Sequence, residues 1–391
     1  MMKHPILCTA LLLASAGAQA GVCRVTPTGN AAHDGSSWGN ALTLQAALGS
    51  TACTEIWVAQ GLYKPTASTD RSISFRIRPG TQVYGGFAGA EGTRAERDIA
   101  TRRSVLSGDI DGDGASADGI DLVVDAAHNA GNSYHVVWID GARVTGIVDA
   151  ATVLDGFTIT AGNANATDYG SDSYGGGLYC KGSGNTSQCS PTLRHLHFSG
   201  NAAVGGGAVM NDGRSDGNSS PGFDGVTFSG NQADDGGAVY NTGDLGVSSP
   251  SFLNTTFSGN LARSFGGAVR NSAYGGVSSP SFSNSTCVGN RAGSDEMSGA
   301  GGAIYTWNSF GTNTGRPRVR HSVFWGNVAA KGATAWTDGN AYIEFDGGLI
   351  EGGCANGGSG GGQCNGTLLT AEPLLGPLQR NGGATATHRP A

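Results

Sequence analysis

Apolar and polar side chains alternate along short segments in the middle of the chain. In Val226-Thr227-Phe228 the two apolar residues lie two positions apart, and Leu196 and Phe198 repeat this spacing one copy earlier. In an extended strand, a period of two places such residues on the same face. Each segment is followed by Gly-Asn or Gly-Gly, where glycine permits the positive φ of a tight turn. The pattern predicts short β-strands, each with one buried face, joined by turns.

Three short phrases recur about every 30 residues, a period typical of a solenoid. The first phrase ends in Gly-Asn, the second reads Gly-Gly-Ala followed by Val or Ile, and the third is a proline that usually follows two serines. Because the phrases keep the same order, each copy corresponds to one coil. The first stands at 197–201, 227–231, 256–260, 286–290 and 323–327, the second at 206–209, 236–239, 266–269 and 301–304, and the third at Pro191, Pro221, Pro250, Pro280 and Pro317.

These coils predict an all-β fold, a right-handed parallel β-helix in which equivalent residues stack about 4.8 Å apart. Stacking places a column of phenylalanines inside the cylinder, in which Cys287 is an apolar filler. Before the repeats, Ala41 to Leu48 predict a short helix that caps the first coil. Beside the phenylalanines we expect an asparagine column, formed by Asn201, Asn231, Asn260, Asn290 and Asn327.

The chain divides into four parts. Residues 1–20 have the features of a signal peptide, with an apolar run followed by Ala18-Gln19-Ala20 as the cleavage site. We expect an N-terminal cap with the first coils at 21–140, the repeats at 141–345 and a C-terminal tail at 346–391. No later run of about 18 apolar residues occurs, so we expect a secreted or surface-displayed protein without a transmembrane helix after cleavage.

The composition argues against a nucleic-acid partner. The chain has 68 glycines, 14% charged residues and a formal net charge of −7. After the signal peptide, lysine occurs only at Lys64, Lys181 and Lys331, so no basic cluster is present to neutralise phosphates. Phe, Val and Thr recur at fixed places, unlike in a disordered glycine-rich linker.

The cysteines of the mature chain are expected to form disulfides in an oxidising compartment. Spacing alone leaves their connectivity open. The nearest pairs along the sequence are Cys23 with Cys53, Cys180 with Cys189, and Cys354 with Cys364.

The phrases over residues 175–335 resemble the FxxN and GGA[ILV] repeats of polymorphic outer-membrane proteins, and more broadly the right-handed parallel β-helix proteins of bacterial envelopes. The copy at Cys287 departs from this pattern, as does Lys331-Gly332-Ala333, which stands in place of a last GGA. Residues 372–391 look like the start of a choice-of-anchor tail that breaks off at Ala391. The resemblance implies a cell-surface or secreted protein of a bacterial envelope.

An acidic segment before the repeats predicts a calcium site. Alternate carboxylates ending in Gly114 supply the oxygen ligands that a hard cation needs. The twelfth position is Ile120 instead of a bidentate Glu, so the motif is not an EF-hand. A solvated acidic loop is the alternative. The candidate ligands are Asp109, Asp111, Asp113, Asp118 and Asp121.

The residue after each GGA[VI] phrase occupies the same place in successive coils, so these residues predict a strip along one face. Aromatic and arginine side chains on a flat β-face suit carbohydrate or protein binding. Ordinary exposed strand residues are the alternative. The strip contains Met210, Tyr240, Arg270 and Tyr305.

Two adjacent acids, Asp234 and Asp235, are the candidates for catalysis, because paired carboxylates held about 5 to 9.5 Å apart can hydrolyse glycosidic bonds. We find no nearby His or Lys that completes such a site. We therefore interpret the chain as an adhesin-like structure that binds an extracellular polysaccharide or a surface protein without catalysis. A polysaccharide lyase or glycoside hydrolase is the alternative.

Overall fold

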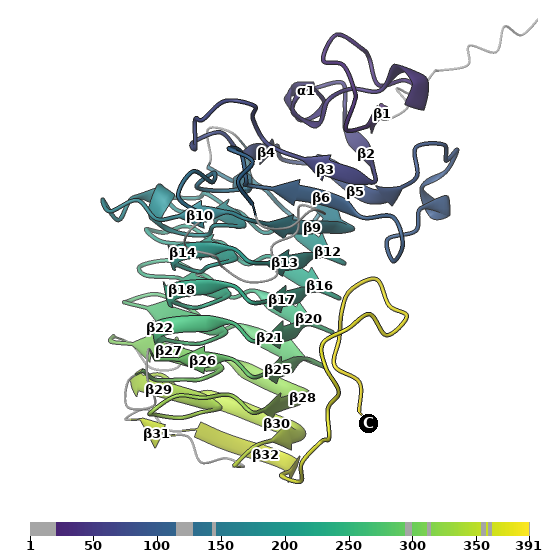
Figure 1. The fold of residues 1–391 in the computed structure, drawn as a ribbon. Helices are drawn as coiled ribbons and strands as arrows, with labels where there is room; N and C mark the ends of the chain where they lie inside the picture. The colour runs from purple at the N-terminus through teal and green to yellow at the C-terminus, as the bar shows by residue number, and fades with distance from the viewer. Residues whose placement is uncertain are drawn as a thin grey trace, which may run out of the picture.

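The computed structural model describes residues 21–114, 128–142, 146–293, 299–310, 314–352, 357–358 and 362–390. The expected all-β fold is confirmed, because short parallel strands stack coil upon coil into a parallel β-helix (Figure 1). The helical segments are α1 (Leu44–Gly49) and the 3-10 turns η1 (Trp38–Asn40), η2 (Arg94–Glu96) and η3 (Ser171–Ser173).

The largest sheet has 18 strands and receives two short strands from most coils. Strand β32 belongs to it, so the stack continues past residue 345, where we expected the repeats to end. Its strands are β1 (Val22–Val25), β2 (Glu55–Ala59), β3 (Gly61–Tyr63), β5 (Gln82–Phe87), β6 (Ser104–Ser107), β8 (Val153–Asp155), β9 (Phe157–Thr160), β12 (Thr192–Arg194), β13 (His197–Ser199), β16 (Gly222–Asp224), β17 (Thr227–Ser229), β20 (Ser251–Leu253), β21 (Thr256–Ser258), β24 (Ser281–Ser283), β25 (Thr286–Val288), β28 (Arg318–Trp325), β30 (Ile343–Ile350) and β32 (Gly362–Leu369).

Two further sheets close the cylinder. The 9-stranded sheet contains β4 (Phe75–Ile77), β7 (Val137–Asp140), β11 (Leu178–Lys181), β15 (Val209–Asp212), β19 (Val239–Thr242), β23 (Val269–Ala273), β27 (Ile304–Asn308), β29 (Ala335–Gly339) and β31 (Gly357–Gly358). The 5-stranded sheet contains β10 (Asn163–Ala164), β14 (Ala202–Gly205), β18 (Gln232–Asp235), β22 (Leu261–Phe265) and β26 (Arg291–Ala292).

Each coil turns at corners where the backbone is left-handed. The glycine of the Gly-Asn phrase and the first glycine of the Gly-Gly phrase make two corners, as at Gly230 (φ 60°) and Gly236 (φ 63°). Glycine, and to a lesser extent Asn and His, tolerate this conformation, which explains the residue types found there. The corner between the paired strands of the large sheet is formed by His195 (φ 47°), Gly225 (φ 63°), Asn254 (φ 50°), Asn284 (φ 51°) and His321 (φ 47°).

Two columns of stacked aromatic rings fill the core. Phe228 lies between Phe198 and Phe257, with ring centroids 5.1 and 4.9 Å apart. All three side chains are buried, so the expected internal column is confirmed. The second residue after each Ser-Pro pair builds another column, which the repeat pattern had not led us to expect. Its rings are stacked at a centroid spacing of 4.9 Å and belong to Phe223, Phe252 and Phe282.

Cys287 takes the place of a phenylalanine in the first column. It lies in register with Phe257 on one side and Phe324 on the other, and it is a buried, free thiol. Burial raises the pKa of this thiol, which therefore stays uncharged. The expectation of an apolar filler is confirmed.

The asparagine column forms a hydrogen-bonded ladder, as expected. Asn231 Nδ2 donates to Asn260 Oδ1 over 2.9 Å and to the carbonyl oxygen of Phe198 over 3.0 Å. The same links continue to Asn290 and Asn327, so the buried amides are satisfied. A second ladder, which we did not anticipate, runs through Asn211, Asn241, Asn271 and Thr306.

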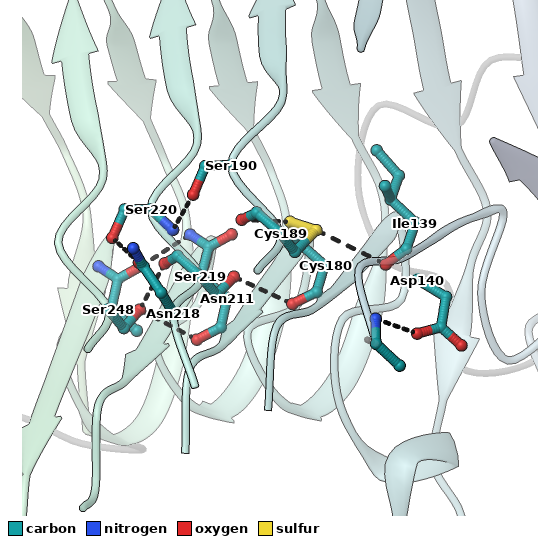
Figure 2. Close-up of a disulfide and its surroundings, with 12 residues drawn as sticks. Ile139, Asp140, Cys180, Cys189, Ser190, Asn211, Asn218, Ser219, Ser220 and Ser248 are labelled. Carbon is teal, nitrogen blue, oxygen red and sulfur yellow. Dashed lines mark hydrogen bonds between the residues drawn. A yellow bond between two sulfur atoms is a disulfide. The ribbon is translucent and has the colours of Figure 1, made fainter. Parts of the chain in front are cut away.

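The disulfide between Cys180 and Cys189 closes the second ladder at its N-terminal end. Cys180 lies in register with Asn211, and Cys189 precedes Ser-Pro just as Ser219 does in the next coil. Figure 2 shows the continuity, since Ser219 Oγ donates to the carbonyl oxygen of Cys180 over 3.0 Å. The expected pairing is confirmed. In this coil the two cysteines stand at the positions that Asn211 and Ser219 occupy in the next coil.

The N-terminal cap contains the expected helix with a later start. Thr43 is the N-cap of α1, because its hydroxyl oxygen accepts a hydrogen bond from the N–H of Ala46 over 3.3 Å. Helix α1 therefore begins at Leu44, whereas we expected Ala41. It packs against β1, β2 and β4 and covers the first coil.

Cys23 and Cys53 form the second expected disulfide, which joins β1 to the turn before β2. The third expected pair, Cys354 with Cys364, lies outside the described side chains, as do residues 1–20 of the expected signal peptide.

The C-terminal tail folds back along the outside of the large sheet, shown in yellow in Figure 1. Gln379 and Thr387 exchange backbone hydrogen bonds of 3.1 and 2.9 Å, which close a hairpin. Arg380 donates to the carbonyl oxygens of Ile99 and Ala100 and so fastens the hairpin near the N-terminal coils. Among the described residues, no helix is long and apolar enough to cross a membrane.

Candidate functional site

A groove of about 320 Å³ crosses the 5-stranded sheet near its N-terminal end. Its apolar surface comes from small side chains, Ala202, Ala203, Val204 and Ala233, on β14 and β18. The strands β14 and β18 pair in parallel with Ala203 opposite Ala233, so small side chains lie next to each other across the two coils. The sheet therefore offers a shallow surface that a flat ligand can approach closely.

Polar side chains surround this surface. Gln232 and the Asp234–Arg263 pair lie on β18 and β22, and Asn165 follows β10. Asn129 also lines the groove, is only 5% exposed, and its Nδ2 has no hydrogen-bond partner among the described residues. A buried amide that lacks a partner marks a place where a ligand can supply one.

Arg71 forms hydrogen bonds with several residues at the N-terminal end of the groove. Its guanidinium donates to the carbonyl oxygens of Asn132 (2.5 Å) and Asn163 (2.9 Å) and to Asn165 Oδ1 (2.8 Å). The ring of Tyr134 lies 4.2 Å from the guanidinium carbon. The asparagine-rich wall is therefore held by one arginine from a segment that is distant in sequence.

The acidic segment lies beside this wall. The carboxylates of Asp109, Asp111 and Asp113 offer oxygens that all lie within 4.8 Å of one another. Asp111 Oδ2 stands 1.8 Å from where a Cβ on Gly131 would be, so only glycine fits at that position. Because the neighbouring Ala130 lines the groove, the acidic cluster and the groove share one turn.

The electrostatics of this cluster suit a cation. Burial, the charge of Asp113 and a hydrogen bond between the carboxyl groups of Asp111 and Asp109 raise the pKa of Asp111. Lys64 Nζ lies 3.3 Å from Asp109 Oδ2 and neutralises part of the charge. Three converging carboxylate oxygens are a fitting but incomplete ligand set for calcium, which takes about 6 to 8 oxygens. The other two expected ligands, Asp118 and Asp121, lie outside the described residues.

The adjacent acids Asp234 and Asp235 have different arginine partners, and only Asp234 lines the groove. Asp234 lines the groove, and its Oδ1 lies 3.2 Å from Arg263 Nη1 of the next coil. Asp235 is not among the groove residues and forms an ion pair with Arg270. Burial raises the pKa of Asp235, and the Arg270 guanidinium acts in the opposite direction. Each carboxylate is therefore paired with an arginine.

The expected strip is aligned as the repeats predict, but much of it is covered. Met210, Tyr240, Arg270 and Tyr305 lie in register on four successive strands. Met210 and Tyr305 are buried. The Arg270 guanidinium lies 4.9 Å from the ring of Tyr240 and 5.9 Å from that of Tyr305. These contacts join neighbouring coils, and a binding role of the strip stays a prediction.

Sequence reasoning missed the groove itself. Its residues come from the Asn129–Ala130 turn and from four successive coils, those of β10, β14, β18 and β22, and they share no motif. One signal was available, because Ala203 and Ala233 repeat at the strand position before Val204 and Asp234. Such a pair indicates a flat surface without saying what surrounds it.

The chain matches none of the protein-family models, curated proteins or solved structures with which it was compared. The resemblance of its repeats to those of polymorphic outer-membrane proteins, and of its tail to a choice-of-anchor tail, therefore stays a prediction.

Proposed function

We propose that the chain is an exported, non-catalytic β-helix protein that binds an extracellular polysaccharide along the groove. The observation that carries the proposal is the unpartnered amide of Asn129 beside a shallow surface of small residues. Amide and charged groups around such a surface suit the hydroxyl groups of a sugar chain, and an apolar surface suits the face of its ring.

The pairing of both candidate acids supports binding without catalysis. A hydrolase of this kind needs one carboxyl group as acid and a second carboxylate as base or nucleophile, both facing the sugar. Asp234 faces the groove in an ion pair with Arg263, whereas Asp235 pairs with Arg270 away from the groove residues. The arginines neutralise both groups.

We also propose that Asp109, Asp111 and Asp113 hold a structural calcium ion next to the groove. Such an ion would fix the turn that carries Ala130 and Asn129, since Asp111 contacts Gly131. Location outside the cytosol is supported by the two disulfides, which persist in oxidising compartments.

Binding is tested by calorimetry with a panel of neutral and acidic polysaccharides. Ala202→Trp fills the groove and should abolish binding, and Gln232→Ala should weaken it about tenfold or less, as expected for a lost hydrogen bond. Ala150→Trp, in an exposed loop outside the groove, is the matched control and should bind like the wild type.

The same incubations are assayed for new reducing ends and unsaturated products, with and without calcium. Binding that Ala202→Trp removes and that leaves the polysaccharide intact supports the proposal. Degradation of a polysaccharide would overturn the non-catalytic assignment in favour of a lyase or hydrolase. Equal binding by the wild type and Ala202→Trp would move the site away from the groove.

A further inference from the structure

Two adjoining hollows lie where the cap meets the first strand of the 9-stranded sheet. One of about 540 Å³ is lined by Thr51, Thr54, Trp138 and Asp140 among others, and a second of equal volume by Gln45 and Ser74 among others. Arg76 and Arg78 line both hollows, so the two form one site with the arginines in the middle. It lies on a different sheet from the groove.

The two arginines have different surroundings. Arg78 donates to the carbonyl oxygens of Gly49 (3.4 Å), Ser50 (2.6 Å) and Cys53 (3.3 Å), so it fastens the C-terminal end of α1 to β4. Arg76 is exposed, and its guanidinium lies 5.1 Å from the ring of Trp138. Among the described residues Arg76 has no hydrogen bond or ion pair, although its charge acts on the carboxylate of Asp172 and helps to lower the pKa of that group.

Each hollow is lined by a residue that has a buried polar atom without a partner. Trp138 is 8% exposed and Ser74 is 4% exposed, and neither Trp138 Nε1 nor Ser74 Oγ has a hydrogen-bond partner among the described residues. Both residues line the site. Polar atoms in this situation are usually satisfied by water or by a ligand.

The charge of the site favours an anion. Asp140 is the carboxylate among the lining residues, and it lies 3.9 Å from Lys181 Nζ, which offsets its charge. Arg76 and Arg78 therefore leave a net positive site. Guanidinium groups bind carboxylate and sulfate oxygens in pairs of parallel hydrogen bonds.

We propose that this arginine site binds the acidic group of a uronic-acid sugar, with Arg76 as the residue that pairs with the carboxylate. The volume, the threonine hydroxyls and the apolar side chains of Ile77 and Pro79 suit a sugar ring, and a bare inorganic anion would fill little of this space. The choice of a sugar rests on the proposed polysaccharide-binding function. Both arginines contribute positive charge, and Arg76 is the one available to the carboxylate because Arg78 already donates to backbone carbonyl oxygens.

The probes are an oligogalacturonate, its methyl-esterified form and inorganic sulfate, each titrated into the full chain by calorimetry. Arg76→Gln should weaken binding of the oligogalacturonate about tenfold, as expected for a lost charge-assisted hydrogen bond. It should leave binding of a neutral polysaccharide unchanged, because the groove lies elsewhere. Arg194→Gln, an exposed arginine on the large sheet, is the matched control and should change neither.

Each outcome decides between the two proposals. Equal binding of the oligogalacturonate by the wild type and Arg76→Gln, or equal binding of the acid and its ester by the wild type, would overturn the arginine site. Competition by sulfate at the same concentration as the oligomer would overturn the sugar assignment. Loss of neutral binding in Ala202→Trp together with any of these results would leave the groove standing.

Discussion

The hydroxyl group of Thr227 donates a hydrogen bond of 2.6 Å to the carbonyl oxygen of Ala386, 159 residues later in the chain. Thr385 Oγ1 donates to the carbonyl oxygen of Gly225 over 3.0 Å, and Ser258 Oγ lies 2.9 Å from Nε2 of His388. The tail therefore covers the outward face of the strands whose inward face carries the phenylalanine column.

His197 should make stability depend on pH. Burial, aided by Arg380 and Arg103, lowers the pKa of His197 from 6.5 to about 4. The folded state thus prefers the neutral ring, so stability is full above pH 6.5 and falls as the pH drops towards 4, by at most about 3 kcal/mol. Urea denaturation at several pH values, compared with His197→Gln, measures this contribution.

Removing the C-terminal tail tests whether the tail causes the low pKa of His197. Removal of residues 371–391 takes away Arg380 and the cover over the sheet, so the pKa of His197 should return towards 6.5. An NMR titration of the ring in both chains reports the change. A pKa that does not move on truncation would contradict the role assigned to the tail.

The phenylalanine column should be a main source of stability. Phe228→Ala leaves a cavity between Phe198 and Phe257 and should lower the free energy of unfolding by about 3 to 5 kcal/mol. Leu253→Ala, at a side chain 40% exposed, is the control and should cost about 0.5 kcal/mol or less. Equal denaturation midpoints for the two variants would argue against the internal column.

The disulfide between Cys180 and Cys189 should contribute about 2 to 3 kcal/mol, because it closes a short loop. Asn211 Oδ1 is buried without a partner, since Cys180 stands where the ladder would place an amide. Cys180→Asn with Cys189→Ser should therefore be about 1 kcal/mol more stable than Cys180→Ala with Cys189→Ala. Denaturant titration of both double variants compares them, and equal stabilities would refute the ladder argument.

Calcium should stabilise the chain weakly. With three carboxylates and no bidentate Glu, we expect a Kd of about 10⁻⁴ to 10⁻³ M. Millimolar calcium should then raise the Tm of the wild type by mass action and leave Asp111→Ala with Asp113→Ala unmoved. If calorimetry detects no heat of calcium binding and calcium does not shift the wild-type Tm, the cluster is a solvated acidic loop.

The columns of the core could be predicted from sequence because stacking repeats a residue at one position. Phe228, Phe257, Asn231 and Asn260 recur at the coil spacing, and their types fit an interior. The second asparagine ladder carries the same signal in the sequence, at Asn211, Asn241 and Asn271, two residues after each Gly-Gly-Ala-Val phrase.

The groove, the arginine site and the docked tail could not be predicted in this way. Asn129 and Arg263 line one groove only because the coils between them stack, and Arg76 lies beside α1 only because the cap folds over the first coil. The tail binds through hydroxyl groups and backbone carbonyls, as at Thr385 and Gly225, which leave no recognisable pattern in a chain rich in Ser and Thr.

The docked tail also determines how the molecule responds to force. Hydrogen bonds between stacked coils run along the axis of the β-helix, so tension along that axis would load the coils in series. A pull on residue 390 would instead act first on the contacts of Thr385 with Gly225 and of His388 with Ser258, on the outside of the large sheet. Force applied to the end of the tail would therefore load these contacts before it loads the hydrogen bonds between coils.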